Sequence, residues 1–136
     1  MTTGRCLCGA VRYEVHGPLR GVLHCYCNEC RRWSGGTFAA TAARRDDLVL
    51  LDETHLRWTS TPASESDARR GFCELCGSGL FWDAPAAATV SISAGSLDDP
   101  SAVAAIGHVY VSQLPRWQVL PDDGLPRHDR LPDSLT

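Results

Sequence analysis

Seven cysteines in three groups constrain this chain more than any other feature of its sequence. The groups are Cys6-Leu-Cys8-Gly, Cys25-Tyr-Cys27-Asn-Glu-Cys30 and Cys73-Glu-Leu-Cys76-Gly. Seven cysteines cannot all pair in disulfides, and residues 1–5 contain nothing like the apolar stretch of a secretory signal peptide. Metal ligation is therefore a better interpretation than a disulfide framework, and we expect a cytosolic location.

The first and third groups have the spacing of ligands to a single ion. On an extended segment, Cys6 and Cys8 would point to the same face. Gly77 tolerates the positive φ that a Cys-x-x-Cys-Gly turn needs. Four thiolates form a closed tetrahedral zinc site, so we assign Cys6, Cys8, Cys73 and Cys76 to a structural zinc. The alternative is two buried cysteines plus a Cys73/Cys76 redox pair, and the sequence lacks the βαβ pattern that accompanies such a pair.

The middle group predicts a different kind of site. Cys25, Cys27 and Cys30 offer three thiolates within a short stretch, which would leave the fourth position of a second zinc open for chemistry. These three cysteines are our candidate catalytic residues. His24 could close the site instead, although its position next to Cys25 would point it to the opposite face of a strand.

Charged residues near the middle group form no recognisable acid–base arrangement. Arg31 and Arg32 are either solvated surface residues or functional residues that offset thiolate charge or hold an anionic substrate. Glu29 is either a solvated turn carboxylate, which is the simpler interpretation, or a proton relay. The other histidines are interpreted as surface or satisfied strand residues: His16, His55, His108 and His128.

Hydrophobic residues with a period of two predict a mainly β chain. Val11, Tyr13 and Val15 alternate with polar residues, as do Leu56 and Trp58, which is typical of half-buried antiparallel strands. Further short strands are predicted at residues 21–27, 37–43, 47–51, 70–73, 79–82, 89–93 and 108–112. Helix is confined to short turns near residues 28–33 and 99–105, and residues 60–69 are predicted to form an exposed loop. The tryptophans are expected in the core or in pocket walls: Trp33, Trp58, Trp82 and Trp117.

Length and charge limit the possible organisation and partners. The 136 residues fit one zinc-binding domain, with residues 121–136 as an extended tail that lacks periodicity. The formal net charge of −3 provides no basic field for nucleic acid, and no run approaches the roughly 18 apolar residues of a membrane span. We therefore expect neither a nucleic-acid nor a membrane partner. The sequence does not predict an oligomeric state.

In their order along the chain, the three cysteine motifs resemble those of the glutathione-dependent formaldehyde-activating enzyme family. Its members carry a Cys-x-Cys-Gly, a Cys-x-Cys-x-x-Cys-Arg and a Cys-x-x-Cys-Gly. The likeness continues through Ser78, Gly95–Pro100, His108–Val111 and Pro115–Trp117, so that it covers roughly Gly4 to Leu125. It implies a mainly β, Mss4-like (β-tent) fold whose antiparallel sheets are held together by zinc. It also implies two zinc ions, one bound by the four cysteines of the first and third groups and the other bound by Cys25, Cys27 and Cys30.

The resemblance also implies a function. It implies a zinc-dependent carbon–sulfur lyase that adds the thiol of glutathione to formaldehyde or a related small aldehyde, giving S-hydroxymethylglutathione in the case of formaldehyde. One departure matters, because Tyr26 stands where the family often has His. If that His assists proton transfer or substrate binding, this chain acts on something else. The alternative is a non-catalytic zinc module that binds a thiol, a metal or a protein partner through the same open site.

Overall fold

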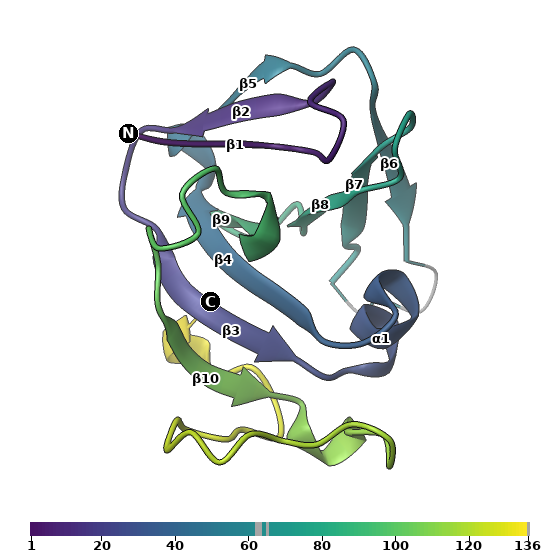
Figure 1. The fold of residues 1–136 in the computed structure, drawn as a ribbon, viewed down its shortest axis with the longest axis vertical. Coiled ribbons are helices and arrows are strands. Elements are labelled where there is room, and N and C mark those ends of the chain that lie inside the picture. Colours follow the sequence, from purple (N-terminus) through teal and green to yellow (C-terminus); the bar gives the residue numbers. More distant parts are fainter. Residues whose placement is uncertain (62–63, 65, 136) are drawn as a thin grey trace.

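The computed structural model describes residues 1–61, 64 and 66–135, and the chain is mainly β with one α-helix. A small antiparallel sheet contains β1 (Thr2–Arg5), β2 (Arg12–Val15) and β5 (Leu48–Asp52), in the order β1-β2-β5. A seven-stranded sheet has the order β10-β3-β4-β9-β8-β7-β6. Its strands are β3 (Arg20–Cys25), β4 (Phe38–Arg44), β6 (Leu56–Ser60), β7 (Arg69–Cys73), β8 (Gly79–Asp83), β9 (Thr89–Ser93) and β10 (Ala105–Val109). The small sheet lies at one end of the molecule and β10 at the other (Figure 1).

The prediction of a mainly β chain with antiparallel sheets is confirmed, with three differences in the strands. One pair in the large sheet, β10 with β3, is parallel. Its strand β10 ends at Val109, earlier than the predicted strand at 108–112, because Tyr110 adopts left-handed backbone angles (φ 58°, ψ 38°) that an extended strand excludes. The strand β1 was not predicted, because Thr2–Arg5 shows no alternation of apolar residues.

Helical structure is short. The predicted turn near residues 28–33 is α1 (Asn28–Ser34), whereas residues 99–105 form turns and the first residue of β10 rather than a helix. Single 3-10 turns occupy Arg45–Asp47, Ala94–Ser96, Val111–Gln113 and Asp133–Leu135. Within the described part of the chain, no helix combines the length and the apolar character needed to cross a membrane. In the predicted loop at residues 60–69, Pro62, Ala63 and Glu65 lie outside the described residues.

The core forms between the two sheets. Val11, Tyr13 and Val15 are fully buried, as their alternation predicts, and the Tyr13 ring meets the edge of Phe81 at 5.4 Å between centroids. Cys6 and Cys73 belong to the same core cluster. These two cysteines are therefore part of the packed interior, whereas Cys8 is exposed and Cys76 is half-buried.

The tryptophans differ in their surroundings. Trp58 stacks on Phe81, and Trp33 contacts the ring of Phe72 edge-on. Trp117 is 66% exposed, which contradicts the expectation that all four tryptophans are core or pocket residues. It lies in an irregular segment after Val111–Gln113, where no regular element packs over it.

Candidate metal centres

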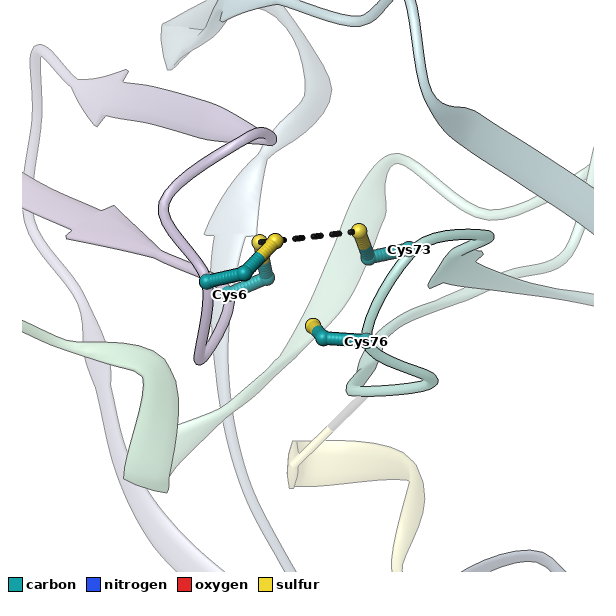
Figure 2. A group of neighbouring side chains, drawn as sticks. Cys6, Cys73 and Cys76 are labelled. Atoms are coloured by element: carbon teal, nitrogen blue, oxygen red, sulfur yellow. Dashed lines mark hydrogen bonds between the residues drawn. The ribbon is translucent and has the colours of Figure 1, made fainter.

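The four cysteines of the first cluster come from two tight turns that face each other. Residues 6–9 form a turn in which the Gly9 N–H donates to the Cys6 carbonyl at 3.2 Å, so this pair is not on an extended strand as the sequence suggested. In the other turn the Gly77 N–H donates to the Cys73 carbonyl at 2.8 Å, and Gly77 has the expected positive φ of 77°. Figure 2 shows the side chains of Cys6, Cys73 and Cys76 pointing toward a common centre.

The spacing of these sulfurs fits a tetrahedral metal ion. The Sγ atoms of Cys6, Cys8, Cys73 and Cys76 all lie within 4.8 Å of one another. The distance from Cys6 Sγ to Cys8 Sγ is 3.7 Å, and that from Cys8 Sγ to Cys73 Sγ is 3.8 Å. Zinc–sulfur bonds of about 2.3 Å at tetrahedral angles place sulfurs about 3.8 Å apart. The cluster therefore has the donor type, number and spacing of a closed zinc site.

Ser78 ties the two turns together. Its Oγ accepts a hydrogen bond from the Leu7 N–H at 3.0 Å and lies 3.1 Å from Cys76 Sγ. The hydrogen bond with the Ser78 hydroxyl lowers the pKa of Cys76 to about 5, which favours the thiolate that a metal requires. Ser78 thus supports the cluster without being a ligand.

The middle cluster is built where β3 ends and α1 begins. Cys25 is the last residue of β3, Cys27 is the N-cap of α1, and Cys30 lies in its first turn. The Cys30 N–H donates to Cys27 Sγ at 3.3 Å, so the cap brings the two sulfurs together. The three Sγ atoms lie within 4.8 Å of one another, and no further His, Cys, Asp or Glu of the described residues joins the set. His24 stacks on His108 at 5.2 Å instead of closing the site.

Electrostatics in this cluster show that the three thiols cannot all ionise without a cation. Hydrogen bonds with Cys25 and Cys30 lower the pKa of Cys27 to about 2, while hydrogen bonds with Cys27 and Cys30 raise the pKa of Cys25. The three thiols thus do not titrate independently, because neighbouring negative charges repel. A divalent cation would relieve this repulsion.

The arginine at the middle cluster is Arg70 on β7, rather than Arg31 or Arg32. Arg70 is only 4% exposed, and its Nη2 donates to Cys30 Sγ at 3.6 Å and lies 3.9 Å from a Glu29 carboxylate oxygen. Its Nη1 is buried without a hydrogen-bond partner among the described residues. Arg31 instead donates to Asn28 Oδ1 at 3.3 Å. No sequence signal near the cysteines identifies Arg70.

Tyr26 points away from the three sulfurs. It is 3% exposed, and its hydroxyl lies 2.8 Å from Nδ1 of His108, which is fully buried. The other ring nitrogen of His108, Nε2, lies 2.8 Å from Asp123 Oδ2. His108 is therefore a satisfied strand residue, one of the two interpretations given above. Tyr26 has a structural partner and does not line the pocket described below.

Tyr26→Phe is expected to lower the free energy of unfolding without removing metal from the middle cluster. The change leaves Nδ1 of His108 buried and unpaired, which costs about 1–3 kcal/mol. Urea unfolding of the metal-loaded protein measures the loss, and elemental analysis measures the metal. A parallel loss of metal would show that the Tyr26 hydroxyl acts on the sulfurs.

A pocket of about 980 Å³ opens beside the middle cluster. Cys25, Cys27 and Cys30 line it, and Phe38 and Trp82 supply apolar walls. Tyr110 lines it as well, and burial followed by the charges of Cys25 and Cys27 raises the pKa of its hydroxyl, which stays protonated at neutral pH. A volume of this size accommodates a ligand as large as a tripeptide.

Two curated proteins are similar to this chain in sequence. The chain is 34% identical over 83 residues to a Halomonas elongata protein provisionally named a glutathione-dependent formaldehyde-activating enzyme, covering 57% of this chain and 53% of that protein. It is 30% identical over 79 residues to an uncharacterized lyase of Schizosaccharomyces pombe, covering 58% and 55%. The chain thus spans about half the length of these curated relatives.

A crystal structure of a Rhodobacter sphaeroides protein has a similar fold. It matches with a TM-score of 0.61 and 22% identity over 92% of this chain and 98% of that one. At this identity the likeness concerns the fold alone. The model of the family described as glutathione-dependent formaldehyde-activating enzyme matches residues 1–113, a stretch that includes both cysteine clusters. The chain therefore belongs to the glutathione-dependent formaldehyde-activating enzyme family.

Proposed function

We propose that this chain is a zinc-dependent carbon–sulfur lyase that adds the thiol of glutathione to formaldehyde or a related small aldehyde. The observation that carries the proposal is the set of three converging sulfurs at Cys25, Cys27 and Cys30 on the wall of a large pocket. Zinc bound there would keep one position free, lower the pKa of a thiol at that position and polarise a carbonyl oxygen. Cys6, Cys8, Cys73 and Cys76 would hold a second, structural zinc, which makes two ions per chain.

The residues around the pocket suit this addition. In the reaction the thiol loses its proton, its sulfur forms a bond to the carbonyl carbon, and the carbonyl oxygen takes up a proton. Arg70 lines the pocket and stabilises negative charge next to Cys30. Arg70 cannot supply the proton, because its guanidinium does not titrate in this range. Phe38 and Trp82 exclude water from one side of the pocket.

Exchange NMR tests the proposal directly. Formaldehyde, glutathione and their adduct interconvert without catalyst, so the exchange rate is measured with zinc-loaded protein, with the same zinc concentration alone, and with buffer. Acceleration by the protein at catalytic concentration is the expected result. A rate equal to that of the zinc control at every protein concentration would rule out this substrate pair.

A non-catalytic zinc module is the second candidate. What favours it is that no histidine is among the described residues that line the pocket, which leaves the carboxylates of Glu29 and Asp129 as the candidate general bases there. Titration calorimetry with glutathione separates the two candidates. Tight binding without accelerated exchange identifies a module, whereas binding accompanied by acceleration identifies the lyase.

A further inference from the structure

The C-terminal segment, Pro121–Leu135, runs along β10 and follows the stretch that the family model matches. The His108 N–H donates to the Pro126 carbonyl at 2.9 Å, and the His128 N–H donates to the His108 carbonyl at 2.8 Å. The Val111 N–H in turn donates to the His128 carbonyl at 3.1 Å. The segment lies beside β10 at the end of the molecule opposite β1 and β2 (Figure 1). This ladder fixes its path next to the strand that pairs with β3.

A series of side-chain hydrogen bonds through the buried His108 links the same segment to the loop that carries Cys25 and Cys27. His108 bridges Tyr26, which lies between two of the three sulfur residues, and Asp123 at the start of the segment. Asp123 Oδ1 also accepts from the Leu125 N–H at 3.0 Å. Because both nitrogens of a fully buried imidazole have partners here, loss of either partner is costly. The position of the segment is therefore coupled to the loop of Cys25 and Cys27.

The fastened segment forms one side of the pocket. Asp129, Arg130 and Leu131 line the cavity that the three sulfurs also line. The end of the segment contacts another residue of the pocket, since the Leu135 carbonyl accepts a hydrogen bond from Arg20 Nη1 at 3.2 Å. Part of the pocket wall thus depends on residues outside the matched family region.

Two positive charges of the pocket lack a carboxylate partner. Arg20 donates to the carbonyls of Gly21, Leu135 and Ala40, and among the described residues no ion pair is formed by Arg20 or by Arg130. Three of the five N–H groups of Arg20 are used in this way, so two remain for a ligand. Arg70, by contrast, already lies beside Glu29 and Cys30. The guanidinium groups of Arg20 and Arg130 therefore favour a ligand that carries an anionic group at some distance from its sulfur-binding end.

We propose that the C-terminal segment forms a wall of the pocket that determines which thiol binds, and that its Arg130, together with Arg20, binds a carboxylate of the thiol substrate. The inference rests on the function proposed above and narrows it to thiols that carry a carboxylate remote from the sulfur. Arg130 is then a specificity-determining residue. Asp123 is a positioning residue that holds the wall in place through His108.

Calorimetry on zinc-loaded protein with two thiols tests the role of Arg130. Glutathione offers free carboxylates, and glutathione diethyl ester offers the same sulfur with the carboxylates masked. Arg130→Gln is expected to weaken glutathione binding about fivefold to tenfold, as for one exposed charge-assisted hydrogen bond, and to leave the diester unchanged. Arg130→Lys keeps the charge and should retain most of the preference. Arg116→Gln is the matched control, because Arg116 is exposed and does not line the pocket.

Hydrogen exchange tests whether Asp123 holds the C-terminal segment beside β10, and this test does not depend on activity. In Asp123→Ala the amides of His128 and Val111 should exchange faster, because the ladder along β10 loosens, while the amide of Ile92 in the core should not change. Asp122→Ala is the control, since the neighbouring Asp122 makes no contact with His108. Unchanged exchange at both amides in Asp123→Ala would refute the positioning role.

The outcomes separate this inference from the proposed function. Equal binding of glutathione by Arg130→Gln and wild type, or an equal loss for both thiols, overturns the inference even if the wild type accelerates the formaldehyde exchange. Binding of glutathione that depends on Arg130, without any acceleration, supports the inference and refutes the lyase. A wild-type protein that neither binds nor accelerates refutes both.

Discussion

Cys73→Ser is expected to abolish cooperative folding. Cys73 is fully buried in the core cluster and supplies one of four sulfurs spaced for a tetrahedral ion. Structural zinc contributes about 10–16 kcal/mol in small zinc domains, which is comparable to the roughly 5–15 kcal/mol stability of a typical domain. A serine hydroxyl is a poor zinc ligand and would be buried among apolar side chains. Circular dichroism during heating should show no cooperative transition, and elemental analysis should show the loss of metal.

Two controls make this result specific. Leu75→Ser changes the same turn at a side chain that is 61% exposed, and it should melt like the wild type. Cys27→Ser removes a sulfur from the other cluster and should preserve a cooperative transition. If Cys73→Ser and Cys27→Ser lost the same amount of stability, the division into a structural and an open site would be wrong.

Cys27→Ser is expected to lower the proposed exchange activity by about a hundredfold or more, the scale seen when an essential catalytic group is removed. Hydrogen bonds with Cys25 and Cys30 lower the pKa of Cys27 to about 2, which favours the thiolate that a metal requires. Serine is a good helix N-cap, so α1 should still begin at Asn28. The substitution thus removes the ligand while keeping the local fold, and metal content should fall from two ions per chain to one.

Exchange NMR and elemental analysis on the same samples check this expectation. Ser112→Ala is the control, because it alters another residue that lines the pocket and leaves all three sulfurs in place. Full activity of Cys27→Ser with a single bound ion would mean that the open site plays no part in catalysis. Retention of two ions would instead mean that Cys27 is not a ligand.

Local patterns in the sequence were sufficient for much of the architecture. The alternation of Val11, Tyr13 and Val15 predicted a strand with one buried face, and all three side chains are buried. The grouping of cysteines into four and three depended on close spacing and on turn residues such as Gly77. Such patterns are readable because side-chain direction repeats every second residue along a strand and because a tight turn needs a particular backbone conformation.

The surroundings of the pocket depended on contacts between distant parts of the chain. Arg70 reaches Cys30 across 40 positions of sequence, and Asp123 reaches His108 from a segment without periodicity. A parallel bridge between His108 and Arg127 sets that second contact, and alternation cannot distinguish parallel from antiparallel partners.

The sequence by itself therefore predicted the two groups of cysteines that converge in the structure and predicted that the chain is mainly β. The tertiary structure alone decided that Arg70 is the cation beside the thiols, that Tyr26 faces away from them, and that the C-terminal segment lines the pocket. The physical reason is the distance along the sequence over which each kind of feature is set. Ligand spacing and strand alternation are set by covalent geometry over a few residues, whereas the position of a charge beside a site follows from how whole strands pack.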